Sequence, residues 1–282
     1  MRIIDHRLEG APFRAAALTG GPIVPEIVVL HDTAGRLAPG NAVEWLATTP
    51  KASVHFVVER DGSVTQLVPT NRRAGHAGQS TWQGRRDCNA FSIGIEIVNP
   101  GRLTRGGGGA AFAWFGQEFG YGEWKLVEMT TPQHGPGLWM PYAEDQIDAV
   151  LALLTALFDA IPTLEDITTH WYVSPGRKID TNPLFPLESL RARVLGRDDP
   201  AEAKAERLSR DAGAGAYVRI AAPGSTLNLR LWPSFNPNVI AQIPNGTEVP
   251  VLRTGLFGGQ GWHKVLFDGR EGWVVARYAK PA

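Results

Sequence analysis

The apolar positions in the first part of the chain predict several strands. The run EIVVLH at 26–31 is apolar between its two ends, as expected for a strand that is covered on both faces. Two β-rich runs within ASVHFVVERDGSVTQLVP (52–69) flank Asp61 and Gly62, and this pattern predicts a hairpin. A further strand is predicted by FSIGIEIV at 91–98.

The segment 142–161 has the periodicity of an amphipathic helix. Asp145 and Asp148 lie on the side opposite to the apolar positions. Those apolar positions are Ile147, Val150, Leu151, Leu154, Leu157 and Phe158. We expect this helix to cover the sheet. Strands and helices mixed in this order predict an α/β fold with a mixed central sheet flanked by helices.

The composition changes abruptly at 196–216, where charged and small residues replace aromatic and branched ones. A chain of 282 residues also exceeds the usual size of one compact core. We therefore expect a catalytic domain at 1–195, a linker at 196–216 and a second domain at 217–282. The last segment has short apolar runs separated by Asn-Gly, Gly-Gly and Asp-Gly turns, which predicts a small β-barrel.

Charge and cysteine content narrow the possible functions. The formal net charge is +0, which gives no sign of a nucleic-acid partner or an anionic membrane surface. Cys88 is the single cysteine, so an internal disulfide framework is excluded. A cysteine peptidase would need an activated thiolate, and nothing near Cys88 in the sequence activates it. The start MRIIDHRLEG lacks a signal-peptide pattern and no run is long enough to span a membrane, so we expect synthesis in the cytoplasm.

The candidate chemistry centres on the loop THWYVSPGRKIDTNP at 169–183, which holds His170, Lys178 and Asp180. Catalytic zinc sites use three protein ligands from His, Asp, Glu or Cys and leave one position for water. His31, at the end of the first predicted strand, completes a set of three with His170 and Asp180. Strand ends are also where α/β sheets form their sites.

The chain resembles the zinc-dependent N-acetylmuramoyl-L-alanine amidases, the family that includes phage lysins and peptidoglycan recognition proteins. The resemblance covers about residues 20–192 and lies in VVLHDTAG, SVHFVVERDGSVTQLVP, AGHAG, CNAFSIGIEIVNPG and HWYVSPGRKIDTNPLFPLESL. It implies one Zn²⁺ per chain, and the family's ligand positions are matched by His31, His170 and Asp180. It also implies Glu96 and Lys178 as the catalytic pair. Aspartate rather than cysteine as the third ligand favours a bacterial amidase over a recognition protein without catalysis.

These residue types suit amide hydrolysis. Two neutral imidazoles and one carboxylate leave a zinc site with net positive charge, so a bound water loses its proton near neutral pH. Glu96 is suited to accept that proton and to pass it to the departing amine. The Lys178 ammonium would stabilise the negative charge on the amide oxygen.

Other residues in the resembling segments have two interpretations each. His55 and His76 either line the substrate cleft or have structural roles. The long segment 105–141 is rich in aromatic residues, which form either a wall of the substrate groove or a hydrophobic cluster of their own. These aromatic residues are Trp114, Phe115, Phe119, Tyr121, Trp124 and Trp139.

The segment 217–282 resembles the bacterial SH3-type domain that is appended to cell-wall enzymes. The resemblance implies binding to the cell wall. The alternative is a structural barrel that binds nothing, in which Trp232, Phe235, Trp262 and Trp273 are core or rim aromatics.

The sequence thus predicts a monomeric zinc hydrolase that cuts the amide between the lactyl group of N-acetylmuramic acid and L-alanine, in peptidoglycan or a muropeptide. It would act on the wall if released, like an endolysin. One alternative is a cytosolic enzyme that recycles soluble anhydro-muropeptides, although Asp87 stands where some such enzymes carry a basic residue. The other is a peptidoglycan-binding protein without catalysis.

Overall fold

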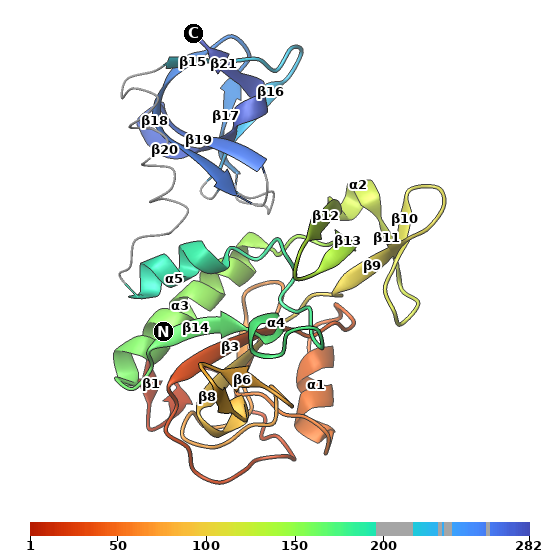
Figure 1. Ribbon diagram of the computed structural model, residues 1–282, viewed down its shortest axis with the longest axis vertical. Coiled ribbons are helices and arrows are strands. Elements are labelled where there is room, and N and C mark those ends of the chain that lie inside the picture. The colour runs from red at the N-terminus through yellow and green to blue at the C-terminus, as the bar shows by residue number, and fades with distance from the viewer. Residues whose placement is uncertain (196–216, 231–232, 234–238, 258–259) are drawn as a thin grey trace. The chain divides into compact units, whose positions relative to one another are not determined.

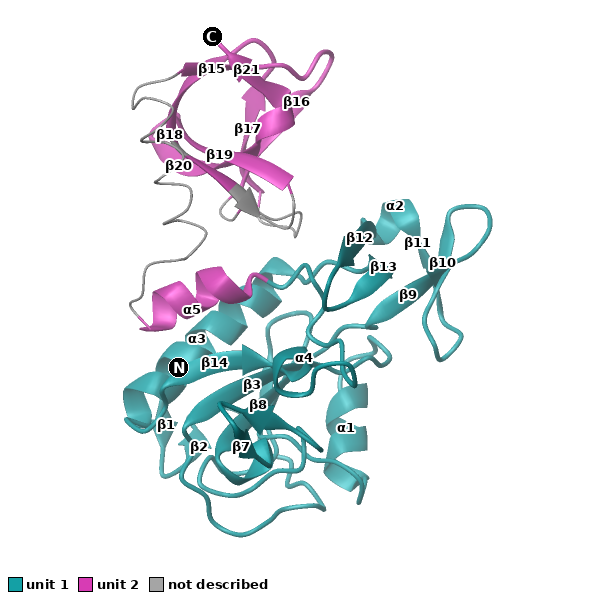
Figure 2. Ribbon diagram, in the orientation of Figure 1, with its two compact units in different colours: residues 1–185 teal, residues 186–282 magenta. Residues whose placement is uncertain are grey.

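The computed structural model describes residues 1–195, 217–230, 233, 239–257 and 260–282 (Figure 1). The chain divides into two compact units, Met1–Phe185 and Pro186–Ala282 (Figure 2). The expected linker at 196–216 lies outside the described residues, as do Trp232 and Phe235.

The first unit is built on a mixed five-stranded sheet with the order β14-β3-β8-β4-β5. Its strands are β3 (Ile27–Asp32), β4 (Phe56–Val58), β5 (Val64–Gln66), β8 (Ser92–Ile97) and β14 (Asp166–Thr169). β3 is parallel to both β14 and β8, β8 is parallel to β4, and β4 forms the predicted hairpin with β5. The fold class expected from the sequence is confirmed, and β14 is an additional strand that the apolar pattern did not predict.

The two central strands are apolar because the sheet is covered on both faces. Every residue of β3 is buried, and in β8 all are buried except Glu96. Helix α1 (Asn41–Thr48) packs Ala42, Leu46 and Ala47 into one core cluster with residues that include Val57. A second cluster of buried side chains joins Ile27 of β3 to residues from other parts of the first unit.

The predicted helix is α3 (Glu144–Ala160), and its apolar stripe is buried. It lies along the sheet (Figure 1), and the amide of Gln146 donates a hydrogen bond to the carbonyl of Val98, just after β8. Its buried residues are Gln146, Ile147, Ala149, Val150, Leu153, Leu154, Ala156 and Leu157. None of the described helices is long and apolar enough to cross a membrane.

The segment between β8 and α3 forms a second, antiparallel sheet with the order β11-β10-β9-β13-β12. Its elements are β9 (Arg102–Arg105), β10 (Ala110–Phe112), β11 (Glu118–Gly120), α2 (Tyr121–Trp124), β12 (Val127–Thr131) and β13 (Gly135–Trp139). This inserted sheet has its own hydrophobic cluster, in which Phe119 is buried and Phe115, Tyr121 and Trp124 are partly buried. Most of its aromatic residues are therefore buried or partly buried, whereas Trp114 is 78% exposed and Phe112 is 38% exposed.

The first unit also contains several short strands and helices outside its two main sheets. They are β1 (Ile3–Ile4), β2 (Arg7–Leu8), β6 (Thr81–Trp82), β7 (Arg85–Arg86), the 3-10 helix η1 (Cys88–Ala90) and α4 (His170–Val173). β1 pairs with β2 and β6 pairs with β7, in both cases antiparallel.

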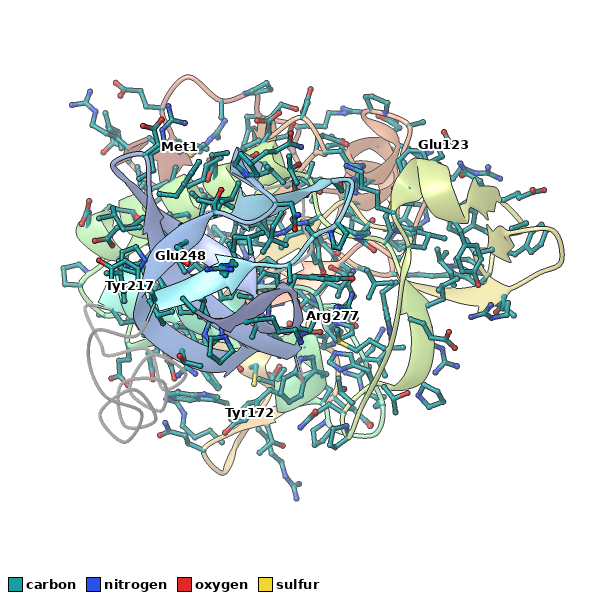
Figure 3. All side chains as sticks on the ribbon, turned by 90° about the horizontal axis from the view of Figure 1, so that it is seen from above. Met1, Glu123, Tyr172, Tyr217, Glu248 and Arg277 are labelled. Atoms are coloured by element: carbon teal, nitrogen blue, oxygen red, sulfur yellow. The ribbon has the colours of Figure 1, made fainter. Side chains whose placement is uncertain are left out.

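The second unit contains helix α5 (Leu187–Leu195) and a seven-stranded sheet that curls into a small barrel (Figure 1). The strands, with the 3-10 helix η2 (Ala276–Tyr278), are β15 (Tyr217–Ile220), β16 (Thr226–Arg230), β17 (Val239–Pro244), β18 (Glu248–Phe257), β19 (Gln260–Phe267), β20 (Arg270–Val275) and β21 (Ala279–Pro281). Tyr217 and Glu248 lie on the neighbouring strands β15 and β18 (Figure 3). The predicted all-β domain is confirmed, and Trp262 and Trp273 are core aromatics in a buried cluster with Val275.

Candidate metal centre and adjoining groove

Three side chains predicted as metal ligands meet at one edge of the central sheet. His31 is the fifth residue of β3, and His170 follows directly after β14. The parallel pairing aligns Thr169 with Leu30, so the next residue of each strand is His170 and His31. Asp180 is brought to them by the loop after α4, whose carbonyl at Asp180 accepts a hydrogen bond from the Trp171 N–H.

The ligand atoms lie at distances that suit a small cation. Nδ1 of His31 and Nδ1 of His170 are 2.9 Å apart. Oδ2 of Asp180 lies 2.9 Å from Nδ1 of His170 and 3.4 Å from Nδ1 of His31. A tetrahedral zinc ion with bonds of about 2.0–2.1 Å separates its ligand atoms by about 3.3 Å. The three atoms therefore need to move by only a few tenths of an ångström to hold Zn²⁺.

Two groups outside the cluster face the second ring nitrogen of His170. Its Nε2 lies 3.2 Å from the carbonyl oxygen of Ala77, which can only accept, and 3.3 Å from Nη2 of Arg177, which can only donate. A proton on Nε2, shared with the Ala77 carbonyl, would leave Nδ1 with a free lone pair. Burial lowers the pKa of His31 to about 4, and burial also lowers the pKa of His76 well below its ordinary value. The rings of His31 and His76 are therefore neutral at neutral pH. A histidine that binds a metal, as proposed for His31, must be neutral.

Glu96 lies next to the ligands because β8 pairs with β3, and the register places Glu96 opposite His31. Its Oε2 is buried and has no hydrogen-bond partner among the described residues. Burial raises the pKa of the Glu96 carboxyl well above its ordinary value, and the charges of Asp180 and Asp32 raise it further. The positive charge of Lys178 acts in the opposite direction. In the absence of a metal, burial therefore favours the protonated form of the Glu96 carboxyl.

A buried hydrogen-bond network that the sequence did not reveal holds the ligand loop. Asp32, one residue after His31, accepts from the Tyr142 hydroxyl at 2.5 Å and from the Asn182 N–H at 2.8 Å. Burial raises the pKa of Asp32 to about 8. The only sequence signal was its position directly after His31, which gave no indication of partners more than a hundred residues away.

The inserted sheet also contacts the ligand loop. His134, in the turn between β12 and β13, donates from Nε2 to the carbonyl of Thr181 at 2.8 Å. The side-chain amide of Asn182 donates to the carbonyl of Met140 at 3.0 Å. Thr181 and Asn182, directly after Asp180, are therefore held by hydrogen bonds to the inserted sheet and to the residue that follows its last strand. The position of His134 in the sequence gave no sign of this contact.

The two histidines expected either in the cleft or in structural roles are both buried. Nδ1 of His55 accepts from the Gly94 N–H at 3.0 Å, and its Nε2 donates to the carbonyl of Arg72 at 2.8 Å. These backbone contacts occupy both ring nitrogens, and a place for His55 in the substrate cleft stays a prediction. His76 lies against His31, with its Nδ1 2.9 Å from Nε2 of His31. The other nitrogen of His76 lies 3.2 Å from Oγ of Ser92, so contacts within the protein occupy both of its ring nitrogens.

Cys88 has none of the properties of a nucleophile. It is buried, and burial raises the pKa of its thiol. A reactive cysteine needs the opposite shift.

A groove of about 340 Å³ lies beside Glu96. Trp45 and Trp114, which are 56% and 78% exposed, both line it. The indole N–H of Trp114 donates to the carbonyl of Ala34 at 2.6 Å, which fixes the ring over the loop that follows β3. Other lining residues include Thr33, Arg36, Asn41 and Phe115. Aromatic side chains and the candidate general base Glu96 thus line the same groove.

Known proteins share both parts of the chain. Residues 20–183 match the family Amidase_2, described as N-acetylmuramoyl-L-alanine amidase, and residues 225–280 match the bacterial SH3 domain family SH3_3. The first match covers more than half of the chain, so the protein belongs to the Amidase_2 family and carries a bacterial SH3 domain. Both resemblances predicted from the sequence are confirmed.

Two relatives are amidases of Escherichia coli (strain K12). The chain is 31% identical to 1,6-anhydro-N-acetylmuramyl-L-alanine amidase AmpD over 146 residues, which are 51% of this chain and 58% of AmpD. It is 28% identical to N-acetylmuramoyl-L-alanine amidase AmiD over 181 residues, which are 61% of this chain and 54% of AmiD. The chain therefore spans little more than half the length of these relatives. A crystal structure of a selenomethionine derivative of AmpD aligns with a TM-score of 0.48 and 24% identity, over 68% of this chain and 99% of that one.

Proposed function

We propose that this protein is a zinc-dependent N-acetylmuramoyl-L-alanine amidase. It hydrolyses the amide between the lactyl group of N-acetylmuramic acid and the L-alanine of the stem peptide. The observation that carries the proposal is the convergence of His31, His170 and Asp180 beside Glu96, which lines a groove and has one buried carboxylate oxygen without a hydrogen-bond partner among the described residues. Membership of the Amidase_2 family and the names of its relatives AmpD and AmiD support the same reaction.

The mechanism assigns a separate task to each side chain. His31, His170 and Asp180 would hold one Zn²⁺. When bound, this ion lowers the pKa of water and polarises the amide carbonyl. Glu96 takes the proton from the attacking water and gives it to the departing amine of L-alanine, a general acid–base role worth about 10²–10⁴-fold. Lys178, whose charge already acts on Glu96 and His31, stabilises the negative charge on the amide oxygen.

The groove beside Glu96 is proposed to hold the sugar and its lactyl group. Exposed indole rings offer flat apolar faces, and the apolar face of a pyranose ring can stack on them. Trp114 supplies one such face, and its hydrogen bond to Ala34 already fixes its orientation. This role would be a second one for the inserted sheet, because most of its aromatic residues pack internally while Trp114 is exposed and lines the groove.

Replacement of Trp114 by alanine is expected to raise KM about 2- to 10-fold for a muropeptide that carries its sugar, with kcat little changed. Loss of one stacked ring removes about 0.5–1.5 kcal/mol of binding, and 1.4 kcal/mol corresponds to a factor of ten. Steady-state kinetics on a soluble muropeptide measures this effect. Phe112→Ala is the matched control, since Phe112 is an exposed aromatic residue of the same sheet that does not line the groove. Equal KM values for Trp114→Ala and the unmodified protein would remove Trp114 from the substrate site.

The barrel is proposed to hold the enzyme on the cell wall, with the catalytic domain at 1–195, a linker at 196–216 and the barrel at 217–282. Tethering raises the local concentration of the catalytic domain and leaves its chemistry unchanged. The SH3-domain match supports this role. Tyr217 and Tyr278 are exposed on the barrel, and the Arg277 guanidinium lies 4.7 Å from the ring centre of Tyr278. We further propose a monomer that acts on the wall after release and binds no nucleic acid.

A chain shortened to end at residue 200 is expected to cleave a soluble muropeptide as fast as the full chain. On intact sacculi the shortened chain is expected to be slower, by up to about 10²-fold, because the tether is lost. Product release from sacculi and from the soluble substrate measures both rates, and thermal unfolding checks that the shortened chain is folded. The isolated barrel should co-sediment with sacculi.

The same experiment tests a second candidate function, recycling of soluble anhydro-muropeptides. The name of AmpD specifies a 1,6-anhydro sugar, and this supports the alternative. Equal rates of both chains on sacculi, without sedimentation of the barrel, would favour recycling over wall lysis. Asp87 stands where the resemblance places a basic residue in some recycling amidases. Here Asp87 forms an ion pair with Arg73 at 2.9 Å.

A further inference from the structure

We propose that His76 is a positioning residue that fixes the tautomer and the orientation of His31, a role that rests on the proposed function of His31 as a metal ligand. His76 contacts neither the groove residues nor the other two ligand atoms through a described hydrogen bond. It acts as the middle of a buried chain of hydrogen bonds that starts at the carbonyl of Cys88, passes through Ser92 and ends at His31.

Each proton in this chain has only one possible place. The Cys88 carbonyl can only accept, so the Ser92 hydroxyl donates its proton there at 2.6 Å. Ser92 Oγ must then accept from Nε2 of His76 at 3.2 Å, so that nitrogen carries the N–H. A neutral imidazole has a single N–H. Nδ1 of His76 is therefore a bare acceptor for the proton on Nε2 of His31, 2.9 Å away.

The position of the proton on His31 determines which of its nitrogens can bind a metal. Because the proton of His31 is held on Nε2, the lone pair of its Nδ1 is free and faces Nδ1 of His170 and Oδ2 of Asp180. Without an acceptor at His76, the proton could sit on Nδ1 of His31 instead and would block ligation. His76 thus selects the ligating tautomer before any metal arrives.

The surrounding residues hold the His76 ring in place. The side-chain oxygen of Asn89 accepts from the backbone N–H groups of His76 and Ala77, at 3.0 and 2.8 Å. The ring lies directly over Gly94, where an added Cβ would be 2.5 Å from Cγ of His76. The glycine two residues before Glu96 therefore leaves room for the ring. His76 meets His31 edge to face, with an angle of 84° between the ring planes.

A neutral partner also preserves the charge of the site. Metal-ligating histidines commonly donate their outer N–H to a carboxylate or a backbone carbonyl. A carboxylate at this place would add a negative charge and oppose the deprotonation of water at the ion. His76 therefore orients the His31 ring without adding a charge to the site.

The test compares zinc affinity in the full chain, measured by competition with a chromogenic chelator. His76→Phe keeps an aromatic ring but removes the acceptor, and we expect it to weaken zinc binding about 10–100-fold, the usual effect of losing such a partner. His76→Asn is the conservative variant, because its side-chain oxygen can occupy the place of Nδ1, and we expect a loss of about 3-fold or less by the same reasoning. Thermal unfolding of the zinc-free variants separates altered folding from altered affinity.

A second measurement needs no substitution. Nitrogen NMR of the zinc-free protein should show His76 and His31 both protonated at Nε2 and bare at Nδ1. Equal zinc affinity in His76→Phe and the unmodified protein, or a proton on Nδ1 of His76, would overturn the proposal. If the unmodified protein binds no zinc while the NMR result holds, the proposed metal function fails and the hydrogen-bond chain stands. The two failures are therefore distinguishable.

Discussion

Asp180→Ala is expected to lose bound zinc and to abolish amide hydrolysis. Asp180 supplies the only carboxylate among the three proposed ligands, and its Oδ2 lies within 3.4 Å of both ligating nitrogens. Zinc sites with four protein ligands bind with about 10–16 kcal/mol, or about 3 kcal/mol for each ligand, so we expect zinc affinity to fall by about 10²-fold or more. Elemental analysis after dialysis measures zinc, and release of the L-alanine amine measures hydrolysis.

The matched control for this substitution is Asp159→Ala, which removes an exposed carboxylate near the end of α3. It should keep about one zinc per chain and full activity. His170→Ala should behave like Asp180→Ala. Retention of zinc and activity in either ligand variant, or full turnover in a strong chelator, would contradict the proposed centre.

Glu96→Gln is expected to keep zinc and to lower kcat by about 10²–10⁴-fold, since only proton transfer is removed. The change is nearly isosteric, so KM should change little. Metal analysis and steady-state kinetics on a soluble muropeptide test both parts. Glu118→Gln, an exposed carboxylate on β11, is the control and should leave both constants unchanged. Loss of zinc in Glu96→Gln would make Glu96 a ligand, and an unchanged kcat would exclude it as the base.

The same variant has an expected effect on the stability of the zinc-free protein. Burial raises the pKa of Glu96 in the folded state, so folding disfavours its charged form. At low pH the carboxyl is protonated in both the folded and the unfolded states, and Glu96→Gln should then change the free energy of unfolding little. Above the unfolded pKa, the native glutamate costs stability that glutamine does not, so the variant should become the more stable of the two as pH rises. Denaturant unfolding at low and neutral pH measures the difference.

Local patterns were sufficient for the central strands, the hairpin and the main helix. The apolar runs of β3 and β8 reflect burial on both faces, and the stripe along α3 reflects burial on one. The residues of the candidate centre were also predicted, because the resemblance lies in short segments around His31, Glu96 and Asp180. The structure brings these residues together, and their roles stay predictions until the substitutions are made.

The partners of those elements were accessible only from the folded chain. β14 is short and mostly polar, so its sequence does not reveal a strand, yet its pairing with β3 places His170 beside a histidine 139 positions earlier. Aromatic residues of the insertion that look alike in the sequence have different environments, since Phe119 is buried in a cluster and Trp114 lines the groove. Periodicity shows that a face will be buried without showing what buries it. Contacts between distant segments, such as those of His76 with His31 and of Asp32 with Tyr142, follow from tertiary packing alone.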